Sequence, residues 1–373
     1  MNYQSLFSNE SFQRTRNVVF FGNQSSFDFQ AGRYLFDLLS EQKKLLRILL
    51  PEHGLFSELQ DQVGKDDETY AGLECRSLYD SQKKNVVPEA SCFENADALL
   101  VDIQDVGVRY YTYTTHLFWL LKCLQENGIE LPVFLIDRQN PAGSKVEGTP
   151  LDARYASFVG LPGLIHRHGM RTGQLLGWMQ RQLNFSGKVI LIPYPDNAAG
   201  DLRINPSPNI PHRSTVLVYP GQCFWEATTF SEGRGTTRPF ELFGHPDLAW
   251  ADCERVAALF NHRFANQALL RPVRIIPAFH KHQNQLCQGF QLHVLNPDAY
   301  HCLLGTLFIM RAILPLFGAA SFWRPGAYEF DSTYTAAQIL LGDDDMIGYV
   351  EGHVDEDFLQ SKLRDAEAAW QLV

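Results

Sequence analysis

The chain has 373 residues, of which 45% are hydrophobic and 20% are charged. This composition is that of a soluble globular protein and excludes disordered, collagen-like and coiled-coil proteins, while the length favours two domains. The 32 Lys and Arg residues against 42 Asp and Glu give a formal charge of −10 and form no basic run, so we expect no nucleic acid as a partner.

Short apolar runs alternate with longer helical patterns in the first half of the chain. Because the runs are apolar at consecutive positions, they are typical of strands buried on both faces of a parallel sheet. The predicted strands lie at 17–21, 46–50, 98–103, 132–136 and 188–192, and the predicted helices at 29–44, 113–127 and 172–183, the last with Thr172 as its cap. This order predicts an α/β fold with a doubly wound, mostly parallel sheet.

The pattern changes near residue 200, where a segment rich in turn residues begins. After it we expect a strand at 214–221, a Gly-rich loop at 231–239, helices at 249–264 and 298–316, and a strand pair at 274–279 and 289–295. We therefore predict two domains, residues 1–205 and a smaller α+β domain at 206–373.

The first twenty residues contain no secretion signal, and no stretch approaches eighteen apolar residues. We therefore expect a cytoplasmic protein that does not insert into membranes. Seven scattered cysteines without a CxxC spacing are expected to be reduced, structural thiols.

Polar side chains follow four of the predicted strands in succession. Because the carboxyl ends of parallel strands meet at one edge of the sheet, and ligands bind there in open sheets, these side chains are candidates for a site. They are Asn23 after the first strand, Glu52 and His53 after the second, Asp102, Gln104 and Asp105 at the third, and Asp137 and Arg138 at the fourth. Glu147, and Glu232 and Arg234 between glycines, are further candidates.

Several common signatures are missing. The first strand leads into GNQSSF, which lacks GxGxxG, and the chain contains no GxxxxGK[ST], GxSxG or HExxH. The HRH and HKH pairs at 166–168 and 280–282 have no acidic or thiol partner at fixed spacing. We therefore predict that the protein needs no cofactor and no metal.

Motifs along residues 17–340 resemble, in order, those of the NamZ-type exo-β-N-acetylmuramidases, glycoside hydrolase family 171, formerly a domain of unknown function. They are PEHG at 51–54, DIQDVGVRYYTY at 102–113, IDRQNPAG at 136–143 with VEG at 146–148, SFVG at 157–160, HGMRTGQL at 168–175, PSPNIP at 206–211, SEGRGT at 231–236 and GFQLHV at 289–294. The resemblance implies a Rossmann-like N-terminal domain, a smaller C-terminal domain and an active-site cleft between them. It also implies removal of β-1,4-linked N-acetylmuramic acid from the non-reducing ends of peptidoglycan fragments, in cell-wall recycling.

The chain departs from the family at LFSELQDQVG after EHG, at DRQNP and at WEATTFSEGRG. The first departure affects the expected shape of the sugar pocket. The missing secretion signal suggests work on imported cell-wall fragments or an unusual export route.

Cleavage of a glycosidic bond needs a proton donor for the leaving oxygen and a second group at the anomeric carbon. Glu52 is the candidate acid, and Asp102, Asp105, Glu147 or Glu232 could fill the second role. The remaining candidates contact substrate: Asn23, His53, Gln104, Arg109, Tyr111, Asp137, Arg138, Glu147, His168 and Arg234. Among them Arg109, Arg138 and Arg234 are candidates for the lactyl carboxylate of the sugar, because a guanidinium can bind a carboxylate through two hydrogen bonds.

The sequence leaves alternatives open for the mechanism, the oligomeric state and the function. A substrate-assisted, a covalent and an inverting mechanism fit the sequence equally, and the oligomeric state is open. A non-catalytic protein that binds muropeptides or another sugar is the main rival, and a nucleotide-sugar enzyme is opposed by the missing phosphate loop. Tyr110, Tyr111, Tyr113, Phe224 and Trp225 could stack on sugars or belong to the core.

Overall fold

The computed structural model describes residues 2–60, 63–64, 66–80, 87–195, 202–329 and 331–371. Two compact units make up the chain. Unit 1 comprises Met1–Gly107, Tyr111–Ser144 and Gly169–Pro208, and unit 2 comprises Val108–Tyr110, Lys145–His168 and Asn209–Val373. The last break falls close to the predicted boundary at 205/206, but residues 108–110 and 145–168 belong to the C-terminal unit.

Unit 1 is built on one central sheet, which has seven strands in the part of the chain that is described. Its strands, in spatial order, are β11 (Val189–Pro193), β8 (Val133–Asp137), β7 (Ala98–Asp102), β1 (Val18–Gly22), β4 (Leu45–Leu50), β6 (Leu73–Ser77) and β5 (Glu68–Tyr70). Every neighbouring pair is parallel except β5 with β6. Each of the five predicted apolar runs forms one of these strands, and the predicted mostly parallel sheet is confirmed.

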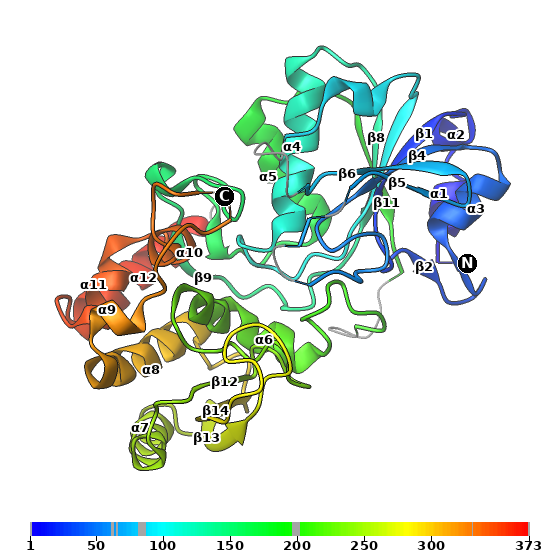
Figure 1. Ribbon diagram of the computed structural model, residues 1–373. Coiled ribbons are helices and arrows are strands. Elements are labelled where there is room, and N and C mark those ends of the chain that lie inside the picture. The colour runs from blue at the N-terminus through cyan, green and yellow to red at the C-terminus, as the bar shows by residue number, and fades with distance from the viewer. Residues whose placement is uncertain are drawn as a thin grey trace. The chain divides into compact units, whose positions relative to one another are not determined.

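Helices cover both faces of this sheet, as Figure 1 shows. On one side lie α1 (Gln4–Phe7), α2 (Glu10–Gln13) and α3 (Leu35–Glu41), and on the other lie α4 (Thr112–Glu126) and α5 (Thr172–Leu183). A short 3₁₀ helix, η1 (Ala90–Phe93), precedes β7. The core on the first side joins Leu6, Phe12 and Phe36 to Phe20 and Phe134 of the strands, all fully buried. The sheet is therefore doubly wound.

The helix predicted at 29–44 begins later than expected. Residues 27–34 form a hairpin of β2 (Phe27–Asp28) and β3 (Arg33–Tyr34), and α3 follows it. Asp28 Oδ1 accepts hydrogen bonds from the backbone of Gln30 and Ala31 at 2.9 and 3.0 Å, and Gly32 has a φ of 65°. An aspartate that bonds to its own turn competes with helix formation, which explains the difference.

The helix at 172–183 is confirmed with the predicted bounds, but its cap is Arg171, not Thr172. Thr172 is the first helical residue, and its hydroxyl donates to the carbonyl of Arg138 at 3.3 Å.

Unit 2 combines helices with small antiparallel sheets. Its helices are α6 (Arg213–Gln222), α7 (Trp250–Arg263), α8 (Cys302–Phe317), α9 (Ala319–Phe322), α10 (Ala336–Leu341), α11 (Asp344–Glu351) and α12 (Glu356–Trp370), with 3₁₀ turns η2 (Ala153–Tyr155) and η3 (Cys223–Ala227). One sheet has the order β12 (Leu242–His245), β14 (Cys287–Val294) and β13 (Ala268–Ile275), and β9 (Glu147–Pro150) pairs with β10 (Ile165–Arg167). The predicted α+β character of this part is confirmed.

Two predictions for this half were wrong. The strand expected at 214–221 is helix α6, in which Thr215, Val216, Val218 and Tyr219 are buried. A continuous apolar run reads the same in a buried strand and a buried helix, so its pattern could not distinguish them. The expected strand at 274–279 overlaps β13 only at its last two residues, whereas β14 matches the expected partner strand.

No described helix has both the length and the apolar character needed to cross a membrane. All seven cysteines are free and buried. Within the described ranges, no group of three or more His, Cys, Asp or Glu side chains could hold a metal ion.

Candidate active site

The strand order of the unit 1 sheet reverses between β1 and β7. From β1 the chain continues to β4 on one side, and later elements add β7, β8 and β11 on the other side. In open α/β sheets this switch point, at the carboxyl ends of the strands, is where ligands bind. The candidates that lie at or after these strand ends in unit 1 are Asn23, Glu52, His53, Asp102, Gln104, Asp105, Tyr111, Asp137 and Arg138.

Glu52 follows β4 and has a buried side chain that is 4% exposed. Its Oε2 accepts a hydrogen bond of 2.5 Å from Oγ1 of Thr112, the first residue of α4. Its backbone N–H donates to Nε2 of His116 at 3.3 Å. Burial lowers the pKa of the His116 imidazole to about 3, and the nearby His53 adds to the effect, so His116 is a neutral acceptor near pH 7. Helix α4 thus holds both the carboxyl group and the backbone of Glu52.

The backbone beside Glu52 adopts strained angles. His53 and Ser57 have φ of 75° and 52°, a region that residues other than glycine rarely adopt, and Gly54 has 85°. At Gly54 the φ of 85° favours glycine, because other residues rarely adopt this conformation. Strain of this kind persists where surrounding structure enforces it, often at functional sites. The PEHG motif therefore places Glu52 at the start of a loop with three left-handed residues.

Three buried polar atoms that follow strands of the central sheet have no hydrogen-bond partner within the described part of the chain. They are Oγ of Ser25 after β1, Nδ1 of His53 after β4 and Nδ2 of Asn140 after β8. Buried polar groups are normally satisfied, so such atoms at a switch point are suited to bind a ligand. Of the three, the sequence predicted only His53. Ser25 and Asn140 share the same signal, a polar residue just beyond a strand.

Asn23 and Tyr111 belong to a network under the segment that contains PSPNIP. Nδ2 of Asn23 donates to Oη of Tyr113 at 3.0 Å and to the carbonyl of Pro206 at 2.9 Å, and Tyr113 donates to the same carbonyl at 3.0 Å. The ring of Tyr111 lies 4.7 Å from that of Tyr113. Burial raises the pKa of Tyr111, and a hydrogen bond with Ser207 partly opposes this effect. The contacts favour a structural role for Asn23.

Asp102 and Arg138 form a buried ion pair. Nε of Arg138 lies 2.5 Å from Oδ1 of Asp102, Nη2 lies 3.1 Å from Oδ2, and the hydroxyl of Tyr3 donates to Oδ2 at 2.8 Å. Nη2 also donates to the carbonyl of Ser25. The charge of Asp102 is therefore compensated, and the contacts favour a structural role for both residues over the predicted roles in catalysis and lactyl binding.

Two neutral donors bind the carboxylate of Asp105. Its Oδ2 accepts from the backbone of Gly107 at 2.8 Å and its Oδ1 from the hydroxyl of Thr114 at 3.1 Å. The side chain of Gln104 donates to the carbonyls of Asp105 and Gln139 at 2.9 and 3.0 Å. Thr112 and Thr114, two residues apart at the start of α4, therefore each bind one candidate carboxylate.

Asp137 stabilises the N-terminus of α5. Its Oδ1 accepts from the backbone of Gly173 at 2.8 Å, and its Oδ2 lies 2.9 Å from Nε of Arg171. An acidic group in this position is favourable for the helix without any ligand.

The remaining candidates belong to unit 2. Arg109 is fully buried there and donates to the carbonyls of Thr149 and Leu341 at 2.9 and 2.8 Å, with His166 Nε2 at 2.8 Å from its Nη2. Burial lowers the pKa of the guanidinium to about 10. These contacts tie separate segments of unit 2 together and favour a structural role over lactyl binding.

Glu147 is also fully buried, and it caps helix α8. Oε2 accepts from the backbone of Cys302 at 2.8 Å, and Arg167 and Lys145 lie 3.0 and 3.3 Å from Oε1. Burial alone would raise the pKa of Glu147, but the charges of His301, Arg167 and Lys145 lower it. The contacts of this carboxylate are those of a structural anchor. His168 is 1% exposed, and its carbonyl accepts from Nε1 of Trp370 at 3.1 Å.

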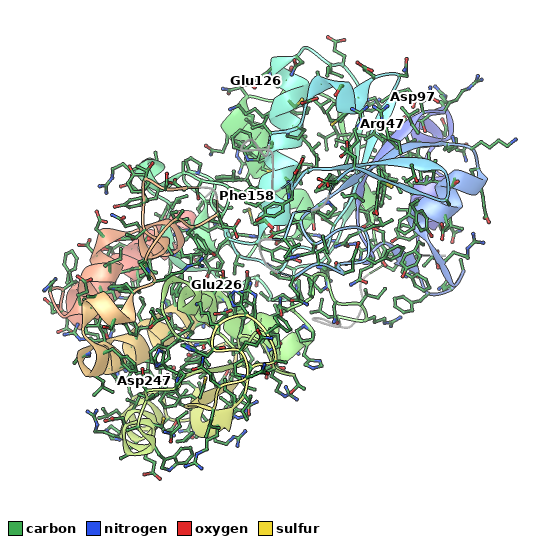
Figure 2. The ribbon with its side chains drawn as sticks, viewed as in Figure 1. Arg47, Asp97, Glu126, Phe158, Glu226 and Asp247 are labelled. Carbon is green, nitrogen blue, oxygen red and sulfur yellow. The ribbon has the colours of Figure 1, made fainter. Side chains whose placement is uncertain are left out.

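Glu232 and Arg234 are buried members of a charged cluster, which we define as Glu226, Glu232, Arg234, His280 and Lys281. Nη1 of Arg234 bridges Glu226 and Glu232 at 3.0 and 3.1 Å, while His280 and Lys281 lie 2.9 and 3.0 Å from Glu232. Burial would raise the pKa of Glu232, but Lys281, His280 and Arg234 hold it well below its ordinary value. Glu232 therefore stays ionised and is unsuited to donate a proton near neutral pH. Glu226, labelled in Figure 2, belongs to unit 2 and was not among the residues predicted from the sequence.

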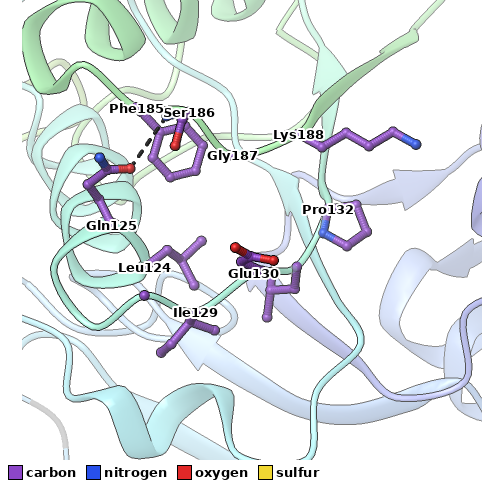
Figure 3. A pocket seen from close by; sticks show the side chains of 11 residues that line it. Leu124, Gln125, Ile129, Glu130, Pro132, Phe185, Ser186, Gly187 and Lys188 are labelled. Atoms are coloured by element: carbon purple, nitrogen blue, oxygen red, sulfur yellow. Dashed lines mark hydrogen bonds between the residues drawn. The ribbon is translucent and has the colours of Figure 1, made fainter.

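A surface pocket of about 480 Å³ lies elsewhere in unit 1. It is lined by Leu124, Ile129 and Phe185, and by Pro132 and Lys188, which precede β8 and β11 (Figure 3). The pocket is thus at the amino edge of the sheet, away from Glu52. Because the predicted site residues of unit 1 follow the carboxyl ends of the strands, the position of this pocket does not indicate the chemistry predicted above.

The structure thus gathers one set of candidates at the carboxyl edge of unit 1 and holds the others inside unit 2. The predicted cleft between the domains stays a prediction.

Comparisons with known proteins match both halves of the chain to the same family. Residues 18–214 match the family model "Exo-beta-N-acetylmuramidase NamZ, N-terminal", and residues 217–372 match the corresponding C-terminal model. The chain is 34% identical over 309 residues to the peptidoglycan beta-N-acetylmuramidase NamZ of Bacillus subtilis (strain 168). The matched residues cover 80% of this chain and 71% of that protein.

Two solved structures of DUF1343 family proteins from Bacteroides fragilis share the fold. One has a TM-score of 0.72 at 25% identity and covers 100% of this chain and 96% of its own. The other has a TM-score of 0.76 at 21% identity, with coverage of 99% and 95%. Since both family models together span nearly the whole chain, the protein belongs to the NamZ exo-β-N-acetylmuramidase family, as its motifs predicted.

Proposed function

We propose that this protein is a glycosidase that removes β-1,4-linked N-acetylmuramic acid from the non-reducing ends of peptidoglycan fragments, with Glu52 as the general acid. The observation that carries the assignment of Glu52 is its buried carboxyl at the switch-point edge, bonded to the hydroxyl of Thr112. Membership of the family and the identity to the Bacillus subtilis enzyme support the activity.

The reaction needs Glu52 to protonate the oxygen of the leaving sugar as the bond to the anomeric carbon breaks. A carboxyl that is buried and anchored by a short hydrogen bond is held in one orientation, which such a transfer requires. The strained backbone at His53 and Gly54 supports the same orientation. A pure binding protein has no need for a carboxyl group placed in this way.

We further propose Asp105 as the second carboxylate of the reaction. Its Oδ2 accepts a hydrogen bond from the backbone N–H of Gly107 and its Oδ1 accepts one from the hydroxyl of Thr114, and these two bonds orient the carboxylate at the same edge of the sheet as Glu52. A carboxylate in this position can orient the 2-acetamido group of the sugar or a water molecule. Ser25, His53 and Asn140 supply unpartnered polar atoms for hydrogen bonds to the sugar.

The net charge of −10 supports a small saccharide as the substrate in place of a nucleic acid. An anionic muramide still needs a local cation, but all three predicted arginines already have contacts within the protein, Arg234 with Glu226 and Glu232. Binding of the lactyl group by one of these arginines stays a prediction.

The direct test is release of the chromophore from an aryl β-N-acetylmuramide, with the aryl β-N-acetylglucosaminide as the control. We expect turnover of the muramide and at least tenfold slower turnover of the glucosaminide. Tight binding of the muramide without any release would support a binding protein and overturn the proposal.

A further inference from the structure

A row of aromatic rings in unit 1 connects the β2–β3 hairpin to the loop after β4. We call Phe29, Phe27, Tyr34 and Phe56 the aromatic row. Consecutive ring centroids are 5.2, 4.9 and 5.6 Å apart, so the rings form a continuous contact. Phe29 is 44% and Phe56 36% exposed, although aromatic side chains of this size are usually buried.

The aromatic row is rigid because buried rings support it. Tyr34 stacks on Phe36 with centroids 4.8 Å apart and an interplanar angle of 9°, and Phe36 is fully buried. Phe56 contacts Phe36 at 6.2 Å and Tyr70 at 5.7 Å, and its backbone N–H donates to Glu58 at 3.0 Å. A surface that is already ordered loses little conformational entropy when it binds a ligand.

The row lies on the same edge of the sheet as Glu52. The hairpin follows β1, Phe56 follows β4, and these two strands are neighbours in the sheet. Phe56 is four residues beyond Glu52, in the loop that the left-handed conformations of His53, Gly54 and Ser57 hold in place. By contrast, the aromatic residues that the sequence offered as sugar-stacking candidates are all buried: Tyr110, Tyr111, Tyr113, Phe224 and Trp225.

We propose that the aromatic row binds the saccharide on the leaving-group side of the scissile bond. The proposal rests on the proposed function. An enzyme that removes the terminal residue places a single sugar on the non-reducing side, so an extended aromatic surface on the same edge of the sheet as the acid is suited to the leaving portion. One face of a β-linked N-acetylglucosaminyl ring presents only C–H groups, and aromatic faces, which carry partial negative charge, attract them.

A positive charge at one end of the aromatic row is consistent with an anionic saccharide as its ligand. The guanidinium of Arg203 lies over the ring of Phe29, 5.3 Å from its centroid. A longer fragment carries further lactyl carboxylates beyond the first N-acetylglucosamine. In a protein with a net charge of −10, a cation at the end of the row attracts such groups.

The test compares two substrates that share the same muramyl residue. One is the disaccharide of N-acetylmuramic acid β-1,4-linked to N-acetylglucosamine, and the other is methyl β-N-acetylmuramide, whose leaving group has no ring. Phe56→Ala and Phe29→Ala are compared with Phe358→Ala, a control on α12 with a similarly exposed ring (51%). We expect kcat/KM for the disaccharide to fall roughly tenfold in the first two variants, mainly through KM, as for loss of an aromatic stacking partner. The methyl glycoside should change less than about twofold, and Phe56→Tyr should retain wild-type values.

Equal losses on both substrates would show that the row only supports the Glu52 loop, and no loss on either would show that it does not touch sugar. Both results overturn the proposal. Calorimetric binding of the disaccharide to Glu52→Gln, with and without Phe56→Ala, measures the contribution of the aromatic row to saccharide binding independently of turnover. If the wild type hydrolyses neither substrate, the proposed function fails, but roughly tenfold weaker binding in the double variant would still establish the row as a saccharide site.

Discussion

The hydroxyl of Thr112 lies 2.5 Å from Oε2 of Glu52, and it reaches that carboxyl from the first turn of α4. The two residues are sixty positions apart, so the fold, and not the PEHG motif alone, orients the proposed acid. A substitution of Glu52 that preserves the hydrogen bond to Thr112 can therefore test its catalytic role without disturbing the fold.

Glu52→Gln preserves size and the acceptor for Thr112 but removes the transferable proton. We expect turnover of the aryl muramide to fall by roughly 10² to 10⁴, the usual contribution of general acid catalysis. The melting temperature should change little, and Glu94→Gln, an exposed change in the same unit, should leave both quantities unaltered. Unchanged turnover in Glu52→Gln would remove this residue from the mechanism.

Ser25→Ala removes a hydroxyl that has no partner among the described residues. If the hydroxyl binds substrate, KM should rise by roughly 2- to 12-fold, the equivalent of about 0.5–1.5 kcal/mol for a neutral hydrogen bond. Stability should stay equal or rise slightly, because no contact within the protein is lost. The matched control is Ser157→Ala in unit 2, whose hydroxyl is also buried and unpartnered in the described structure. Similar kinetics for the two variants would count against a role for Ser25.

Glu232→Gln tests whether the charged cluster is structural. The change leaves the buried Arg234 and the half-buried Lys281 beside a neutral group, so we expect the free energy of unfolding to fall by about 3–5 kcal/mol, measured by urea denaturation. Glu254→Gln on the exposed side of α7 should be nearly neutral. A stable Glu232→Gln protein that has lost turnover would instead place Glu232 in the reaction.

His116 should make the fold sensitive to mild acid. Its pKa is about 3 in the folded protein, because of burial first and His53 second, against an ordinary value of 6.5. The folded pKa is depressed, so between these values only the unfolded chain binds the proton, and stability falls as the pH drops below about 6.5. From pH 7 to pH 5 the loss attributable to His116 is about 2 kcal/mol.

His116→Gln keeps an acceptor for the backbone of Glu52 but cannot titrate. Urea unfolding at both pH values should therefore show a smaller acid loss in the variant than in the wild type. An equal loss in both proteins would mean that His116 does not carry this dependence.

The sequence predicted the central sheet well, because strands buried on both faces leave continuous apolar runs such as the one ending at Leu50. It could not distinguish the buried helix α6 from a strand, and it did not predict that Asp28 would form the turn of a hairpin. For single residues, the polar positions after strands located the edge that holds Glu52. The pattern could not reveal that Asp102 is neutralised by Arg138, or that Arg109 binds the carbonyl of Leu341, because both partners come from distant segments.

The division of the chain into units constrains how it folds during synthesis. Residues 145–168 leave the ribosome before unit 1 is complete at residue 208, yet they belong to unit 2. Their partners come last: Glu367 accepts from the backbone of Gly148 at 2.8 Å, and Trp370 donates to the carbonyl of His168. In a nascent chain, Glu147 therefore lacks its α8 backbone partner until 155 further residues have been made, and the α12 partners of this segment follow later still. A stop codon that removed α12 would accordingly damage a strand pair encoded near the middle of the chain, and proteolysis of such a product is expected to begin there.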